Sequence, residues 1–129
     1  MKAKILVVDD NEQNLYLATF LLTTNGFEIV TAKDGKEALR QVVAERPDLI
    51  LMDIELPEMD GYDVTRRVKV LSEFKDIPII AVSSFAMVGD AEKAIVSGCS
   101  GYIEKPINPE TFVAEVERFV RPTRSGGEQ

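Results

Sequence analysis

The chain contains several short apolar runs, and these runs limit its fold more than any other feature of the sequence. The clearest predicted strands are residues 5–8, 49–53 and 79–82. A short apolar run bounded by polar residues is typical of a strand buried on both faces, as in a parallel sheet. Weaker runs at residues 27–31 and 102–103 complete the set of predicted strands.

Segments with the apolar spacing of an amphipathic helix follow each predicted strand. The third helix is expected to continue through Leu71, and the fourth to run from about Met87 to Val96. The last is expected to start at Asn108 and Pro109. Capping residues, glycine or proline mark the other predicted helix ends. These residues are Asn11, Gly26, Asp34, Glu37, Pro47, Asp60 and Gly98.

This alternation of strand and helix predicts an α/β protein with a doubly wound parallel sheet. Each crossover between parallel strands is right-handed, so the helices cover both faces of the sheet. The second strand has no candidate site residue at its end, which suits an edge position in the order 2-1-3-4-5. That order is the one found in the flavodoxin-like fold.

Composition places the chain among ordinary globular proteins with one domain. Of its 129 residues, 45% are hydrophobic and 29% are charged, without a low-complexity block. A chain of this length can build one well-buried core but hardly two. We expect a folded domain over residues 1–120 and a flexible polar tail over residues 121–129.

Charge and apolar content exclude several classes of partner. A formal net charge of −7 argues against a nucleic-acid surface, which needs clustered Lys and Arg. The lone Cys99 cannot form an internal disulfide, and the N-terminal residues lack a signal-peptide pattern. No apolar stretch approaches the roughly 20 residues that cross a bilayer. We therefore expect a cytoplasmic protein that binds neither nucleic acid nor membrane.

Polar side chains follow four of the predicted strands at the point where each strand ends. They are Asp9, Asp10, Asp53, Ser83 and Lys105. Because the carboxyl ends of parallel strands meet at one edge of a sheet, these groups should share a crevice, where such sheets bind ligands. Three carboxylates placed together are costly unless a cation joins them. The pattern predicts a site for a metal ion and a phosphoryl group.

The residue types at this edge favour carboxylate chemistry. The chain has no histidine, so the commonest metal ligand and general base is missing. Asp53 can attack a phosphoryl group and carry it as an acyl phosphate. Asp9 and Asp10 would repel that group, and Mg²⁺, which binds carboxylates and phosphate oxygens, best relieves the repulsion. A backbone carbonyl is expected as a further ligand, with that of Glu55 as the candidate.

Two further residues can respond to the charge that a phosphoryl group on Asp53 would add. Lys105 can donate to the phosphoryl oxygens, and Ser83 can hydrogen-bond one of them. Taken singly, each residue has a simpler explanation, since Asp caps helices and Lys is usually a surface charge. Their recurrence at equivalent strand ends favours a common site.

Several of these residues belong to motifs that resemble the receiver domain of two-component response regulators. The motifs are Val7-Val8-Asp9-Asp10, Leu51-Met52-Asp53-Ile54-Glu55-Leu56-Pro57-Glu58-Met59-Asp60-Gly61, Ala81-Val82-Ser83 and Glu104-Lys105-Pro106. The resemblance extends from Lys4 to about Val120, in the same order along the chain. Within the family, the stretch Phe85-Ala86-Met87-Val88-Gly89-Asp90 is similar to single-domain regulators of the cell-cycle phosphorelay type and to receivers of hybrid kinases.

The resemblance implies a phosphoacceptor signalling domain that is not an enzyme beyond assisting its own phosphorylation and slow dephosphorylation. It implies that a histidine kinase or histidine phosphotransfer protein phosphorylates Asp53. It also implies that Asp10, Asp53 and the Glu55 carbonyl bind Mg²⁺ with help from Asp9. The Lys105-Pro106 bond is cis in this family, which would aim Lys105 into the crevice.

The resemblance further implies a switch. Phosphorylation adds a charge of about −2, draws Ser83 inward and leaves space for Tyr102, although a Tyr at this place is also a common half-buried strand residue. The altered face would act on a separate downstream protein, with the chain a monomer or weak dimer. Ser83 stands where Thr is commoner in the family, and Ser84 where a small Ala or Gly is usual. Ser84, with Glu55 and Phe85 beside the opening, could change phosphoryl entry or lifetime in either direction.

Three alternatives remain at this stage. The Asp53-Ile54-Glu55 stretch superficially resembles the two-acid motif of aspartate-based phosphohydrolases, but those enzymes carry it after the first strand. A flavin protein would share the fold, but the turn after the first strand is acidic where a flavin phosphate needs donors. The chain could also be a module excised from a hybrid kinase, against which the initial Met1 and the short tail speak mildly.

Overall fold

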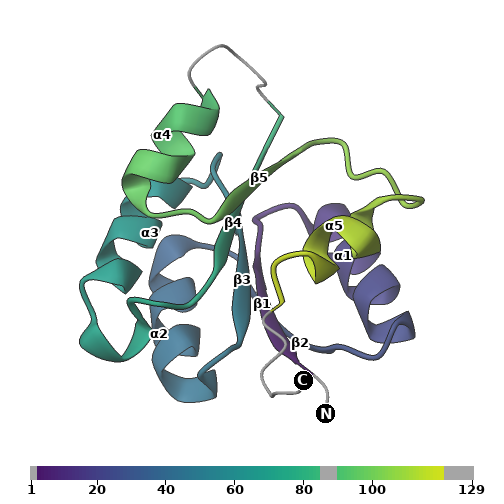
Figure 1. Cartoon of the computed structure of the whole chain (residues 1–129), viewed down its shortest axis with the longest axis horizontal. Coiled ribbons are helices and arrows are strands. Elements are labelled where there is room, and N and C mark those ends of the chain that lie inside the picture. Colours follow the sequence, from purple (N-terminus) through teal and green to yellow (C-terminus); the bar gives the residue numbers. More distant parts are fainter. Residues whose placement is uncertain (1–2, 85–89, 121–129) are drawn as a thin grey trace.

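Five parallel strands form one sheet in the computed structural model, which describes residues 3–84 and 90–120 (Figure 1). The strand order is β2-β1-β3-β4-β5, as the sequence predicts. The strands are β1 Lys4–Val8, β2 Glu28–Ala32, β3 Leu49–Asp53, β4 Ile79–Ser83 and β5 Gly101–Glu104. The central strands β3 and β4 are buried along their whole length, which explains their unbroken apolar runs.

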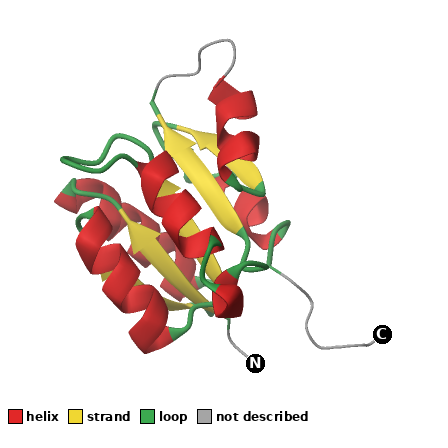
Figure 2. Cartoon of the chain, turned by 90° about the vertical axis from the view of Figure 1, so that its left-hand side faces the viewer, coloured by secondary structure: helices red, strands yellow, loops and turns green. Residues whose placement is uncertain are grey.

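Helices cover both faces of this sheet (Figures 1 and 2). They are α1 Glu12–Thr24, α2 Gly35–Glu45, α3 Gly61–Lys69, α4 Asp90–Ser97 and α5 Phe112–Glu117, with a short 3-10 helix, η1, at Ser72–Phe74. Helices α2, α3 and α4 pack on one face, and α1 and α5 pack on the other. Successive strand residues serve opposite faces: Leu6 and Val8 pack toward α2, whereas Ile5 and Val7 pack toward α1.

Local capping explains where three of the helices begin. Each of three predicted caps accepts a hydrogen bond from the backbone three residues later, at 2.8 to 3.0 Å. The caps are Asn11, Asp34 and Asp60. Glu37 completes the capping box by accepting from the Lys33 amide at 2.8 Å. The starts of these three helices are therefore fixed by short-range sequence signals.

Two helix predictions are wrong. The third helix ends at Lys69 instead of including Leu71, because the chain turns there into η1, and the Leu71 amide bonds to Val68 O. The last helix starts at Phe112 instead of Asn108, whose carbonyl and side chain both accept bonds from the following turn. Asn competes with helix formation in this way when its side chain bonds to nearby backbone.

Smaller differences concern element bounds. Strand β2 lies one residue later than predicted, and β5 is longer, at Gly101–Glu104. Helix α4 ends at Ser97, next to the predicted end, but Met87 lies outside the described residues. Phe85 and the predicted tail at 121–129 lie outside them as well. The Lys105-Pro106 peptide bond is cis, as the family resemblance implies.

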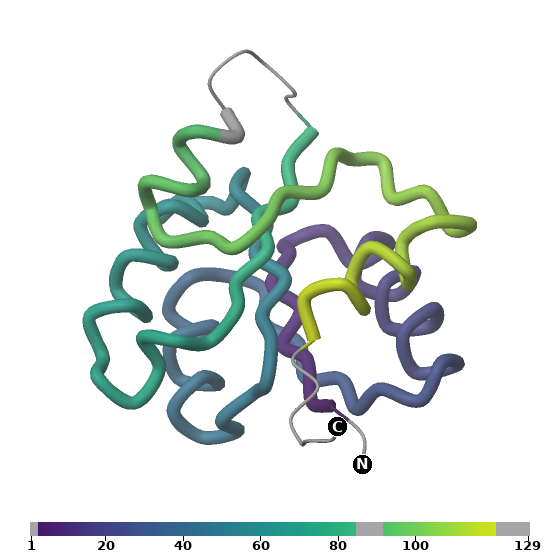
Figure 3. Tube along the Cα trace, viewed as in Figure 1, coloured from purple at the N-terminus to yellow at the C-terminus, as the bar shows by residue number. Residues whose placement is uncertain are grey.

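The carboxyl ends of the strands gather at one edge of the sheet. Figure 3 shows the chain segments after β1, β3 and β5 leaving the sheet at this common edge. Open parallel sheets bind their ligands there. Over the part of the chain that the structure describes, no helix has the length and apolar character needed to span a membrane.

Candidate functional site

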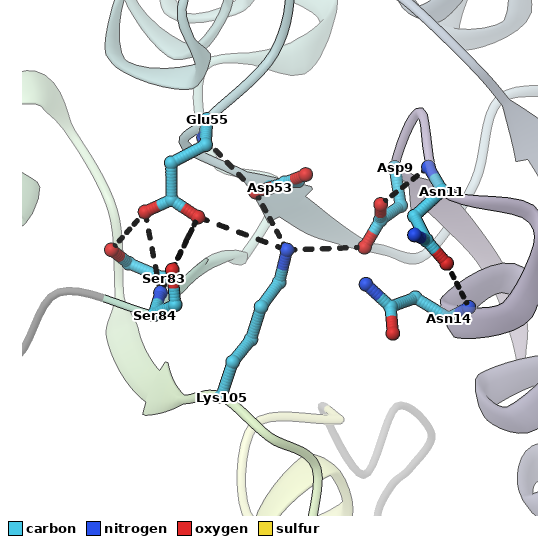
Figure 4. A network of polar contacts seen from close by, with 8 residues as sticks. All are labelled: Asp9, Asn11, Asn14, Asp53, Glu55, Ser83, Ser84 and Lys105. Carbon is cyan, nitrogen blue, oxygen red and sulfur yellow. Dashed lines mark hydrogen bonds and ion pairs between the residues drawn. The ribbon is translucent and has the colours of Figure 1, made fainter.

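The site is built from the ends of four neighbouring strands. Asp9 follows β1, Asp53 ends β3, Ser83 ends β4 and Lys105 follows β5. Strand register brings them together, since Asp53 pairs with Val82 across β3 and β4. The Lys105 amide then bonds to Ser83 O at 2.8 Å. Figure 4 shows the resulting network of side chains.

Three aspartates converge at this edge, as predicted. One carboxylate oxygen from each of Asp9, Asp10 and Asp53 lies within 4.8 Å of the others. Asp9 and Asp53 are buried, whereas Asp10 is exposed to solvent. Charges this close and this dehydrated repel one another strongly. The cluster therefore favours the approach of a cation from the solvent side.

Backbone amides fix the two buried carboxylates. The Asn11 amide donates to Asp9 Oδ1 at 2.9 Å, and the Glu55 amide donates to Asp53 Oδ1 at 3.0 Å. Both donors lie two residues after their acceptor, in the turn that follows each strand. The turns orient Asp9 and Asp53 before any ligand arrives.

Lys105 is the cation that joins the acids. Its Nζ lies 3.1 Å from Asp53 Oδ1, 3.4 Å from Asp9 Oδ2 and 3.8 Å from Glu55 Oε1. The Lys105 side chain is 14% exposed, so these contacts are shielded from much of the solvent. The predicted meeting of Lys105 with the acids is confirmed as geometry.

Burial and charge change the acid strengths in the site. Burial, with the nearby Asp9 carboxylate, raises the pKa of Asp53 from 3.8 to about 6, although Lys105 and the Glu55 amide act in the opposite direction. For Lys105, burial lowers the pKa, but the charges of Asp53 and Asp9 outweigh it and the net pKa is raised. One lysine thus does not compensate the negative charge at this edge.

The donor set fits a hard divalent cation. Asp9, Asp10 and Asp53 offer carboxylate oxygens, which Mg²⁺ prefers, and the excess negative charge at Asp53 would be relieved by an ion. Such an ion would also neutralise charge on an incoming phosphoryl group. The Glu55 carbonyl remains the predicted backbone ligand.

Ser83 and Ser84 bond to the Glu55 side chain. The Ser83 hydroxyl donates to Glu55 Oε2 at 2.5 Å, and the Ser84 hydroxyl donates to Oε1 at 3.1 Å. The Ser84 amide also points at this carboxylate, 3.2 Å from Oε2. From the sequence, the Glu55 carbonyl was predicted as a ligand and Glu55 was placed beside the opening, but this role of its carboxylate was not predicted. The acid at position 55 and the extra hydroxyl at position 84 were the available signals.

Tyr102 lies in β5, beside Ala81 of β4. It is half-buried and packs against the core cluster on the side of α2, α3 and α4. This position agrees with a strand aromatic and leaves its switch role a prediction. Phe85, expected beside the opening, lies outside the described residues.

Comparison with known proteins relates the chain to one large group. Residues 5–117 match the response regulator receiver domain. A polar-differentiation response regulator DivK from Brucella anthropi is 42% identical over 120 residues, covering 93% of this chain and 98% of that protein. The protein of the same name from Brucella abortus is 41% identical over the same length.

Solved structures agree with this relationship. The chemotaxis response regulator CheY4 of Vibrio cholerae matches with a TM-score of 0.88 and 31% identity, over 92% of this chain and 99% of that one. The receiver domain of the sensor histidine kinase PA1611 from Pseudomonas aeruginosa matches with a TM-score of 0.84 and 32% identity, over 93% and 98%. That structure has a magnesium ion coordinated in its active site cleft.

Proposed function

The chain belongs to the response regulator receiver domain family, and we propose that it accepts a phosphoryl group on Asp53 and thereby switches its interactions with other proteins. The family resemblance and the doubly wound fold expected from the sequence are both confirmed. The chain covers 98% of the length of a related regulator, DivK of Brucella anthropi. Receiver domains are signalling domains, so the phosphohydrolase and flavin alternatives lose their support.

The contact between Asp53 and Lys105 carries this proposal. A carboxylate oxygen of Asp53 attacks the phosphorus of a phosphohistidine, forming a P–O bond as the P–N bond breaks, and the imidazole leaves with a proton. Lys105 Nζ, 3.1 Å from Asp53 Oδ1, is placed to donate to the transferred oxygens. The donor is a histidine kinase or a histidine phosphotransfer protein.

Asp9, Asp10, Asp53 and the Glu55 carbonyl are the proposed ligands of Mg²⁺. The three carboxylates lie close enough to share one ion. Burial and the charge of Asp9, which together raise the pKa of Asp53 to about 6, favour binding of a cation. A related receiver domain, of the kinase PA1611, contains magnesium in its active site cleft.

Ser83, Tyr102 and Lys105 form the proposed switch. Phosphorylation adds a charge of about −2 beside Lys105 and biases Ser83 toward the new oxygens. Ser83 and Lys105 are linked through the β4 and β5 backbone, where Lys105 N bonds to Ser83 O at 2.8 Å. Movement of Ser83 is therefore passed to β5, which carries Tyr102. The altered surface acts on a downstream protein, with the chain a monomer or weak dimer.

Intact mass measurement after incubation with acetyl phosphate and Mg²⁺ tests the phosphoacceptor. We expect the wild type to gain one phosphoryl group and Asp53→Asn to gain none. Asp76→Asn is the matched control, because Asp76 is exposed and lies away from this edge, before β4. Equal phosphorylation of wild type and Asp53→Asn would disprove the assignment of Asp53.

A further inference from the structure

The Glu55 carboxylate accepts hydrogen bonds from Ser83 and Ser84, which lie beside Asp53 (Figure 4). We propose that it acts as an internal competitor for the phosphoryl group: it binds these donors in the unphosphorylated protein and has to leave them when Asp53 is phosphorylated. This inference rests on the proposed function of Asp53. It concerns the side chain of Glu55, separately from the carbonyl proposed as a metal ligand.

Three donors converge on this one side chain. Ser83 Oγ lies 2.5 Å from Glu55 Oε2, and the Ser84 amide lies 3.2 Å from the same oxygen. Ser84 Oγ lies 3.1 Å from Glu55 Oε1. Hydrogen bonds to an ionised acceptor are among the stronger ones in proteins. The contacts therefore hold the carboxylate in one defined position.

The same groups are the ones that a phosphoryl group on Asp53 would use. Lys105 Nζ lies 3.1 Å from Asp53 Oδ1 and 3.8 Å from Glu55 Oε1, so it already faces both acids. Carboxylate and phosphoryl oxygens are both anionic acceptors that suit hydroxyl, amide and ammonium donors. Because the two anions also repel each other, they do not share the donors easily.

The position of Glu55 lets it leave. Its side chain is 29% exposed, against 2% for that of Asp53, so its carboxylate can regain water by rotating outward. Two arrangements follow, one with Glu55 bound to the serines and one with the serines available to a phosphoryl group. Ser84, which replaces the usual small residue of the family, adds a hydroxyl donor that favours the first arrangement.

The rate of phosphorylation by acetyl phosphate tests the competition. We expect Glu55→Gln to gain phosphoryl mass about tenfold faster than the wild type, equivalent to about 1.4 kcal/mol, because the competing charge is removed. Glu58→Gln is the matched control: it removes the same charge from an exposed residue of the same loop and should leave the rate unchanged. A Glu55→Gln rate equal to or below that of the wild type would overturn the proposal.

Ser84→Ala tests the same contact from its other side. It keeps the Glu55 carboxylate but removes the 3.1 Å hydroxyl bond, so a smaller acceleration, about threefold, is expected.

The NMR chemical shift of the Ser84 amide proton tests the contact without phosphorylation. In Glu55→Gln this signal should move upfield, because the charged acceptor is lost. An unmoved signal would also overturn the proposal. If the wild type gains no phosphoryl mass at all, the proposed function fails, whereas a phosphorylated wild type with an equal Glu55→Gln rate refutes the competitor alone.

Discussion

The two edges of the sheet differ in how their charged side chains are arranged: acids are paired with basic residues at the amino edge, whereas acids cluster at the carboxyl edge. At the amino edge, Lys4 Nζ lies 3.1 Å from Glu45 Oε1, and the Lys4 amide donates to Asp48 Oδ2 at 2.8 Å. Arg46 nearby pairs with Glu73 at 3.3 Å. Lys4 and Arg46 each pair with an acid at this edge, and all four side chains are more exposed than that of Lys105. Their arrangement is compatible with a purely stabilising role.

At the carboxyl edge, three aspartates converge and Lys105 contacts two of them. Asp53 is 1% exposed, and its pKa is raised to about 6 by burial and by Asp9. An arrangement that costs stability at one place of an otherwise consistent fold is typical of a functional site. Uncompensated charge and burial, more than the presence of acids, therefore distinguish the edge where the chemistry is proposed.

Removal of the shared cation should produce the largest effect. Lys105→Met leaves Asp9 and Asp53 buried without their partner, so we expect the free energy of unfolding to fall by about 3 kcal/mol at pH 7.5 without Mg²⁺. Urea unfolding measures this change. Lys33→Met is the control, since Lys33 pairs with Glu12 at an exposed position, with side chains 59% and 80% exposed. If the free energy of unfolding falls by the same small amount in both variants, Lys105 contributes no more to stability than a lysine in an exposed ion pair.

Asp53→Asn should have a smaller effect of the opposite sign. The pKa of Asp53 rises from 3.8 to about 6 on folding, so the folded protein binds this proton more tightly than the unfolded chain. The stability from this proton is fully present below pH 3.8 and is lost as the pH rises through about 6. We expect Asp53→Asn to be more stable than wild type by about 2 kcal/mol at pH 7.5 without Mg²⁺.

The stability difference between Asp53→Asn and the wild type should depend on pH. Between pH 6 and pH 4 the advantage of Asp53→Asn should shrink, as the wild-type carboxyl becomes protonated in the folded state. Asp48→Asn, at the amino edge, should instead destabilise the protein, because a neutral amide oxygen accepts the Lys4 N–H less strongly than the Asp48 carboxylate does. Urea unfolding across this pH range measures both. An Asp53→Asn variant less stable than wild type at pH 7.5 would contradict the raised pKa.

Magnesium should partly relieve the excess negative charge of the carboxyl edge and thereby stabilise the folded protein. An ion bound only by the folded protein stabilises it by about 1.4 kcal/mol at ten times its dissociation constant. We expect thermal unfolding of the wild type to shift upward with MgCl₂ and that of Asp10→Asn to shift much less. Asp10 is exposed, so its substitution should leave the fold intact. An equal shift in both would place the ion elsewhere.

Much of the fold was predictable because its signals are local. Caps such as Asn11 and Asp60 act on an amide three residues away, and strands buried on both faces need uninterrupted apolar runs. The start of α5 was not predictable in this way, since Asn108 bonds to the turn that precedes the helix. Helical spacing alone does not distinguish such a turn from a first helical turn.

The sequence predicted which residues of the candidate site meet at the strand ends, but not the contacts between their side chains. Asp9, Asp53 and Lys105 meet because parallel strands end at one edge, which follows from topology alone. The bonds of Glu55 to Ser83 and Ser84 depend on the direction of one side chain across two loops. Sequence spacing contains no information on that direction, so the contact required the structure.

The smallest effect is expected at the amino edge, for Glu73→Gln. Glu73 Oε1 lies 3.3 Å from Arg46 Nη1, but the two side chains are 62% and 60% exposed, so water screens the pair. Arg46 also keeps its contact over the Phe74 ring, 5.3 Å from the ring centre, when the acid is neutralised. We expect the free energy of unfolding to change by less than about 0.5 kcal/mol in urea unfolding, at low and at high salt. A loss above about 1 kcal/mol that vanishes in salt would show that this edge also depends on charge, and the contrast would then rest on burial alone.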